Sequence, residues 1–106
     1  MWPGDDDPRA HHVVVDGLAV GSVLPQPDGS WRVRGMATAP EARGRGLGAQ
    51  VLDELLAHAR GQGATLVWCN ARPRALSLYE RAGFVAVGEP WDDPELGPHQ
   101  RMELQI

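Results

Sequence analysis

The spacing of apolar residues divides the chain into short elements. β-Branched and apolar runs over residues 11–15 and 18–24 flank Asp16-Gly17, a dipeptide that favours a tight turn, so they predict an antiparallel hairpin. After a segment rich in turn-forming residues, alternation over 31–39 predicts a third strand, which Pro40 ends.

Helical spacing follows this strand. Apolar residues then recur at steps that keep them on one face of a helix: Leu47, Val51, Leu52, Leu55, Leu56 and Ala59. Gly61 and Gly63 are expected to end the helix. Residues 64–69, which lack polar alternation, predict a strand covered on both faces. Strand, helix and strand in this order imply a right-handed parallel crossover.

The last part of the chain predicts a second, shorter helix and two strands. Pro73 suits a first helical turn, an apolar stripe follows it, and Gly83 ends the helix. Residues 84–88 and 99–105 are expected to be strands joined by a proline-rich loop. The predicted fold class is α/β, an α+β mixed sheet of about six strands with two main helices. One domain is expected over 1–106, with a flexible N-terminal segment over 1–10.

Composition narrows the class of protein. The chain has 106 residues, 42% of them hydrophobic, which suits one core in one small domain. Cys69 is the single cysteine, so no internal disulfide can form. The first residues lack the basic flank and apolar run of a signal peptide, and no apolar run approaches the roughly 20 residues of a membrane span. We therefore expect a cytoplasmic protein with no membrane partner.

Charge is unevenly distributed along the chain. The net charge is -4, yet residues 29–81 hold eight of the ten arginines against four acids, and lysine is absent. An acidic protein with a basic middle does not resemble a nucleic-acid binder, and it favours one local anion site. The acidic clusters at 5–7 and 89–95 are expected to be a solvated terminus and loop, or alternatively a rim that attracts a cationic amine.

A glycine-rich segment between the third strand and the first helix is the most informative stretch. In Arg43-Gly44-Arg45-Gly46-Leu47-Gly48, the helix start offers unpaired N–H groups, and the glycines let a diphosphate approach closely. The two arginines add forked donors that suit phosphate oxygens. A ligand-free turn remains the alternative.

The same segment matches a dinucleotide-binding pattern, G-x-G-x-x-A, at Gly44, Gly46 and Ala49. That pattern needs an acidic residue about 20 positions later. No Asp or Glu lies between Glu54 and Glu80, and a complete dinucleotide-binding domain does not fit in this length. The dinucleotide interpretation is therefore disfavoured.

Three motifs follow one another along the chain: residues 35–41, the glycine-rich segment 43–48, and Ala75 with residues 78–84. In this order they resemble the GNAT superfamily of acetyl-CoA-dependent N-acetyltransferases. The resemblance covers roughly residues 12–105 and implies an acyl-CoA N-acyltransferase fold. It is a short form, because the family's usual N-terminal strand and two helices, which wall the acceptor site, are lacking or come from a second subunit of a homodimer.

The resemblance also assigns roles to residues. It implies that backbone groups of the third strand hold the pantetheine arm where this strand splays from 64–69, and that amides of the glycine-rich segment hold the CoA pyrophosphate. The residues implied in cofactor binding are Met36, Ala37, Thr38, Arg43, Gly44, Arg45, Gly46, Leu47, Gly48 and Ala49. Tyr79 matches the tyrosine that protonates the leaving thiolate, and packing in the core is its alternative role.

Two features leave the site incomplete in the sequence. Where the family often has an asparagine that contacts the cofactor, this chain has Arg72. We therefore expect Asn70 and Arg72 only to lie near the cofactor. No carboxylate lies on the strand before the glycine-rich segment. The first candidate for the general base that takes the amine proton is His99, and the second is His12. His11 and His12 should point to opposite faces of a strand, so no metal site is predicted.

The function expected from the resemblance is acetyl transfer from acetyl-CoA to a primary amine, by direct attack in a ternary complex. The acceptor is a small-molecule or peptide amine that the sequence does not identify. Two alternatives remain open: a CoA-binding regulatory or structural module without acetyl transfer, and an interaction protein that uses the fold for dimerisation.

Overall fold

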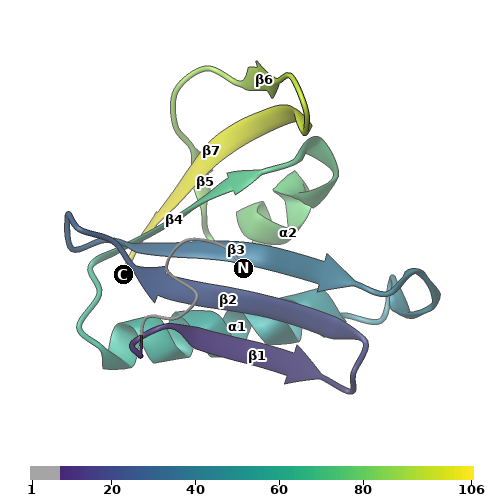
Figure 1. The fold of residues 1–106 in the computed structure, drawn as a ribbon, viewed down its shortest axis with the longest axis horizontal. Coiled ribbons are helices and arrows are strands. Elements are labelled where there is room, and N and C mark those ends of the chain that lie inside the picture. Colours follow the sequence, from purple (N-terminus) through teal and green to yellow (C-terminus); the bar gives the residue numbers. More distant parts are fainter. Residues whose placement is uncertain (1–7) are drawn as a thin grey trace.

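Seven strands and two α-helices make up the structure, a computed structural model that describes residues 8–106 (Figure 1). The elements are β1 (His11–Val15), β2 (Ala19–Pro25), β3 (Trp31–Thr38), η1 (Pro40–Ala42), α1 (Leu47–Gly61), β4 (Leu66–Ala71), η2 (Pro73–Ala75), α2 (Leu76–Arg81), β5 (Val85–Ala86), β6 (Trp91–Asp93) and β7 (Gly97–Gln105). The mixed α+β class is confirmed. The expected flexible segment over 1–10 falls mostly outside the described residues.

The strands form one sheet in the order β1-β2-β3-β4-β7-β5, and β6 pairs with β7 off this path. The predicted hairpin is present, because Asp16 and Gly17 both have positive φ (55° and 68°) and turn β1 back onto β2. Among these strands, β3 and β4 are the parallel pair, joined through α1 as the sequence predicts.

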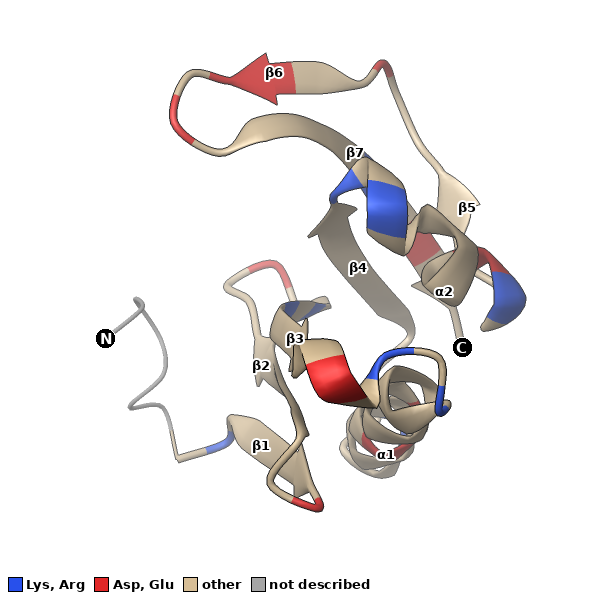
Figure 2. Cartoon of the chain, turned by 90° about the vertical axis from the view of Figure 1, so that its right-hand side faces the viewer, with Lys and Arg blue, Asp and Glu red and all other residues tan. Residues whose placement is uncertain are grey.

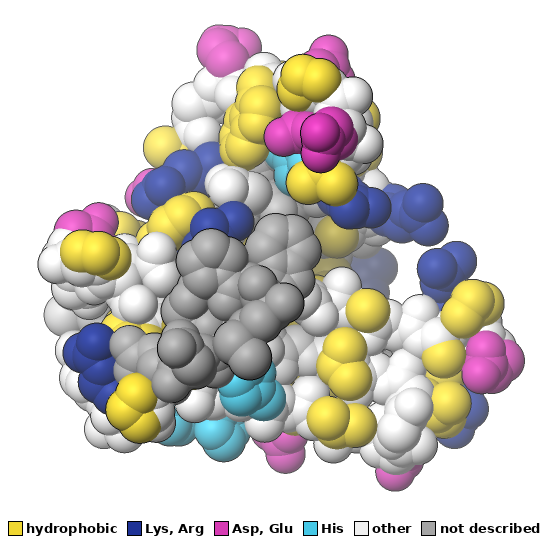
Figure 3. Space-filling view, viewed as in Figure 1, with side chains coloured by type: hydrophobic (Ala, Val, Ile, Leu, Met, Phe, Trp, Pro, Cys, Tyr) yellow, Lys and Arg dark blue, Asp and Glu magenta, His cyan; other side chains and the backbone are white. Residues whose placement is uncertain are grey.

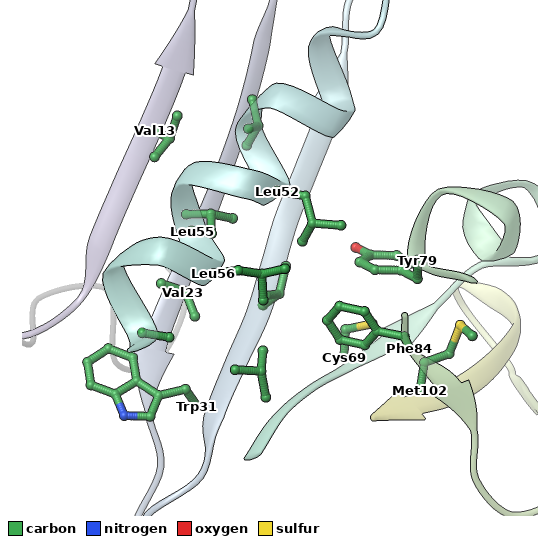
Figure 4. Close-up of a cluster of buried hydrophobic side chains, with 14 of the residues drawn as sticks. Val13, Val23, Trp31, Leu52, Leu55, Leu56, Cys69, Tyr79, Phe84 and Met102 are labelled. Carbon is green, nitrogen blue, oxygen red and sulfur yellow. The ribbon is translucent and has the colours of Figure 1, made fainter. Parts of the chain in front are cut away.

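Helix α1 lies on the sheet because its apolar stripe meets β2 at close range. Gly21 of β2 is buried, and a Cβ atom built on it would lie 2.7 Å from Cγ1 of Val51 and 3.1 Å from Cδ1 of Leu55. The absence of a side chain at this position therefore sets how closely the helix approaches. Figure 4 shows Leu52, Leu55 and Leu56 of α1 directed into the resulting core.

Helices α1 and α2 lie on the same side of the sheet (Figures 1 and 2). Within residues 8–106, no helix covers the opposite side, which we call the helix-free face. Along β4, Val67, Cys69 and Ala71 are buried toward the helices, whereas Trp68 and Asn70 point the other way and are half-buried. The prediction of a strand covered on both faces therefore holds fully for the helix side only, because the second face is half-buried under side chains and no helix of residues 8–106 packs over it.

The C-terminal part of the sheet also differs from expectation. Strand β5 has two residues where five were predicted, and β6 was not predicted at all. Three residues of the proline-rich segment, Trp91–Asp93, pair with the start of β7, which begins at Gly97 rather than at 99. The added hairpin brings Trp91 onto His99, with consequences for the site.

Candidate functional site

The glycine-rich segment folds as a loop that opens α1. Gly44 (φ 84°) and Gly46 (φ 76°) are in the left-handed region, where glycine has no steric penalty, and Gly46 is the N-cap of the helix. The N–H of Gln50 donates the first helical bond, to Gly46, so the N–H groups that precede it point out of the helix end. Apart from the residues that flank each glycine, no atom of the described residues lies within 4 Å of a Cβ placed at Gly44 or Gly46.

The chemistry of this loop suits a diphosphate. Arg43 and Arg45 are exposed beside the helix start, and the first turn of α1 holds no acidic residue that would oppose an anion. The open space, outward N–H groups and two guanidinium groups together offer donors and positive charge to a diphosphate.

Strand β3 separates from β4 after Arg32, its second residue, and stays apart from it as far as Thr38. Their pairing is confined to Trp31 with Val67 and Arg32 with Trp68, although β3 continues to Thr38. A bulge assists the divergence: Gly35 has φ 70°, and the register between β2 and β3 shifts there. The splay expected between these strands is thus present. The β4-facing edge of Met36, Ala37 and Thr38 has no strand partner among the described residues.

Helix α2 meets the loop and β3 at Gly48. A Cβ at Gly48 would lie 3.6 Å from Oγ1 of Thr38 and 3.7 Å from Cδ2 of Leu78. All three motifs singled out in the sequence therefore converge at the N-terminus of α1. Asn70 lies at the end of β4 on the helix-free face, and Arg72 is exposed in the next loop, so both border the far side of the splay.

Tyr79 lies in the core, 4% exposed, with its ring edge-on to Phe84 at 5.3 Å (Figure 4). Its hydroxyl donates a hydrogen bond to the thiol of Cys69. The pKa of Tyr79 is raised mainly by burial and to a smaller extent by the neighbouring Cys69. Burial also raises the pKa of Cys69, to about 12. Both groups are therefore protonated near neutral pH, and the buried thiol of Cys69 is unreactive.

His99 is 9% exposed and has a defined orientation. Its Nδ1 donates a hydrogen bond to the carbonyl of Gly97 (2.9 Å), and its ring stacks on Trp91 with 5.6 Å between centroids. In the neutral ring, Nε2 then carries the free lone pair that a base needs. His99 and Arg101 alternate with the core-facing Met102 on β7, which directs them to the helix-free face.

The other candidate histidines lie elsewhere. His12 on β1 hydrogen bonds to Ser22 Oγ at 2.6 Å, and two strands separate β1 from the splay. His11 points to the opposite face, as alternation predicts, and stacks on His58 at 4.2 Å. A hollow lined by His11, His58 and Glu54 lies at that far edge of the sheet and contains none of the motif residues. Trp31, at the start of β3, is a core residue at 6% exposure.

The family model of the acetyltransferase (GNAT) domain matches residues 8–86, the segment that holds the splay and the loop. The chain belongs to the GNAT family. A curated relative, the uncharacterized N-acetyltransferase YitI of Bacillus subtilis, is 32% identical over 77% of this chain and 59% of its own length. This GNAT chain thus spans less than two thirds of that relative.

Solved structures share the GNAT fold. Escherichia coli ElaA superposes with a TM-score of 0.82 at 18% identity, over 97% of this chain and 73% of that protein. An aminoglycoside 6'-N-acetyltransferase complexed with coenzyme A superposes with a TM-score of 0.78 at 13% identity, over 93% and 74% of the two chains. Within residues 8–106, no helix of this GNAT chain is long and apolar enough to cross a membrane.

Sequence reasoning missed one cluster beside the splay. The guanidinium groups of Arg32 and Arg101 lie over the ring of Trp68, with Cζ 5.0 Å and 4.1 Å from its centroid. Trp68 in turn donates to Ser30 Oγ at 2.9 Å. Alternation along the strand predicts that Arg32 faces away from Trp31 and Val33. It does not predict which strand pairs with this one or in which register, so it cannot place Arg32 beside Trp68.

Proposed function

We propose that this protein transfers an acetyl group from acetyl-CoA to a primary amine. The observation that carries the proposal is the separation of β3 from β4 directly beside the glycine loop of α1. Such a gap accepts an extended chain against the free edge of β3, and the loop accepts a diphosphate at the end of that chain. Membership of the GNAT family supports the same assignment.

Different residues would bind different parts of the cosubstrate, acetyl-CoA. Backbone groups of Met36, Ala37 and Thr38 offer hydrogen bonds along the free edge of β3. The loop residues 43–49 would hold the pyrophosphate through amides and through the guanidinium groups of Arg43 and Arg45. Asn70 and Arg72 border the same gap and are proposed as neighbours of the cofactor. When bound, acetyl-CoA supplies the acetyl group as a reactive thioester.

Two side chains would move protons during direct attack in a ternary complex. The amine nitrogen forms a bond to the acetyl carbon while the carbon–sulfur bond breaks, so the amine loses a proton and the thiolate gains one. Nε2 of His99 is proposed to take the amine proton, and the hydroxyl of Tyr79 to protonate the thiolate. Cys69 is a weak acceptor, so transferring the Tyr79 hydrogen bond to a thiolate costs little.

Binding and turnover should be measured separately. Calorimetry tests affinity for CoA and acetyl-CoA, and release of free thiol from acetyl-CoA with a panel of amines tests transfer. We expect micromolar cofactor binding and amine-dependent thiol release. Absence of binding at high micromolar ligand would refute the proposal, whereas binding without turnover on any amine would favour a CoA-binding regulatory module.

The alternative module has one observation in its favour. Tyr79 is buried in the core and its hydroxyl already has a partner, as expected of a structural tyrosine. Turnover that Tyr79→Phe abolishes, with unchanged affinity for CoA, would exclude that alternative. A homodimer and a cytoplasmic location remain part of the proposal, and sedimentation analysis of the purified chain tests the first.

A further inference from the structure

Three arginines share the helix-free face around the point where β3 and β4 separate. Arg32 and Arg34 alternate with core residues on β3, and Arg101 occupies the matching face of β7. Arg32 pairs in register with Trp68, and Arg101 pairs with Asn70, so the group surrounds the start of the splay. Figure 3 shows this face, with basic side chains gathered over β4 and β7.

The cluster is held in place rather than free in solvent. Asp28 accepts hydrogen bonds from the N–H and the hydroxyl of Ser30, at 2.9 and 2.6 Å, and Ser30 Oγ accepts one from the Trp68 indole. The fixed indole carries Arg32 and Arg101 on its ring. Guanidinium groups ordered in this way lose less conformational entropy when they bind a ligand.

Arg101 and Arg32 differ in the partners that the described residues offer them. Arg101 forms an ion pair with Glu103 at 2.8 Å. The Nε of Arg32 is buried and has no hydrogen-bond partner among the described residues. Burial lowers the pKa of Arg32, and the charges of Arg34 and Arg101 lower it further, so these cations lie close enough to repel one another. A bound anion would relieve this repulsion and accept from the buried donor.

The position of the cluster indicates which molecule would carry that anion. Leu52, Tyr79 and Cys69 are buried on the helix side of the strands, so a reactant approaching the start of the splay from outside meets the helix-free face. His99, the proposed base, is directed to this face as well. An amine positioned beside His99 would therefore place its remaining groups near the arginines.

We propose that Arg32, Arg34 and Arg101 bind an anionic group, a carboxylate or a phosphate, of the amine that accepts the acetyl group. The inference rests on the proposed acetyl transfer and specifies its acceptor as an amine that also carries a negative charge. Guanidinium groups bind carboxylates and phosphates alike, through paired hydrogen bonds. A carboxylate-bearing and a phosphate-bearing amine are therefore tested with separate probes.

Equilibrium binding to the CoA-bound protein tests the inference without requiring turnover. The probes are phosphoethanolamine against ethanolamine, and β-alanine against 3-aminopropanamide, each measured by calorimetry. We expect at least one charged probe to bind about ten-fold to a hundred-fold more tightly than its neutral partner, which is what a charge-assisted hydrogen bond contributes. The pair that shows the preference identifies phosphate or carboxylate.

Variants assign the preference to the arginines. Arg32→Gln should remove most of it, Arg32→Lys should retain part of it, and neither should change the affinity for CoA. The control is Arg60→Gln, an exposed arginine in the last turn of α1 on the other side of the sheet, which should behave as wild type.

Three results would overturn the inference. They are equal binding of charged and neutral probes, a charge preference that survives Arg32→Gln, and a loss of CoA affinity in Arg32→Gln, which would assign the arginine to the cofactor. None of these abolishes amine-dependent thiol release in the wild type. Failure of acetyl transfer itself is recognised separately, as binding of CoA without thiol release from any amine.

Discussion

Substitution of Gly21 by alanine tests whether close packing of α1 on β2 determines the stability of this fold. The new Cβ would lie 2.7 Å from Cγ1 of Val51 and 3.1 Å from Cδ1 of Leu55, and would also contact Sδ of Met36. Carbon atoms pack at about 3.5–4.0 Å, so Val51 must retreat by roughly 1 Å. Met36 can change rotamer, but Val51 is fully buried and β-branched, so the helix itself has to move.

Overpacking of this kind costs about 1–3 kcal/mol. For a domain of this size each kcal/mol lowers the melting temperature by about 5 °C, so we expect a decrease of roughly 5–15 °C in thermal unfolding followed by circular dichroism. Gly61→Ala is the matched control, because a Cβ built there would meet no atom of residues 8–106 within 4 Å apart from its chain neighbours and its own helix backbone, and its φ is not positive. That variant should be neutral or more stable, since alanine favours helix.

A second change distinguishes packing from other causes. Val51→Ala in the Gly21→Ala background removes the methyl groups that the new Cβ meets, so part of the lost stability should return. The reasoning would be refuted if Gly21→Ala melted within about 2 °C of wild type. It would equally be refuted if Gly61→Ala caused the same loss of stability, because the effect of alanine would then not depend on the space available at each position.

Three further outcomes follow from the site. Gly46→Asp should abolish CoA binding, because the carboxylate repels the diphosphate. Gly46→Asn should lose far less affinity in calorimetry, because asparagine tolerates the left-handed conformation and carries no charge. Equal losses in the two variants would refute the assignment of this loop to the pyrophosphate. Tyr79→Phe should reduce thiol release by about 100-fold or more with CoA affinity retained, and unchanged turnover would leave Tyr79 a core residue. The free energy of unfolding should fall as pH rises above about 9, because the Cys69 thiol ionises near 9.0 when unfolded and near 12 when folded, so the folded state retains the proton. Cys69→Ala should flatten this slope between pH 9 and 10 in urea titrations, and an unaltered slope would contradict the assigned burial effect.

Local elements could be predicted because their hydrogen bonds form between neighbours in the chain. The Asp16-Gly17 turn needs two residues with positive φ, and α1 needs an apolar stripe and a start that glycine permits. Strand boundaries were less accurate: the strand expected over 64–69 is observed as Leu66–Ala71. Strand β6 was missed because three residues in a proline-rich, acidic segment become a strand only when β7 lies beside them.

The arrangement of the site required information that is not local. The order of residues does not reveal that Arg32 and Arg101, 69 positions apart in the sequence, cover the ring of Trp68. The contact between Tyr79 and Cys69 likewise depends on how α2 packs against β4. Each contact depends on strand register and on helix placement, which the whole core determines.

By itself, the sequence of this GNAT chain determined the order of its elements apart from β6, the family motifs and the glycine loop at the start of α1, because turns and helix ends depend on nearby residues. Only the tertiary structure decided that β3 leaves β4 after Arg32, that three motifs converge at Gly48, and that the arginines gather on the helix-free face. The physical reason is that sheet pairing joins residues distant in the chain, so its register is chosen by the packing of all strands against the helices.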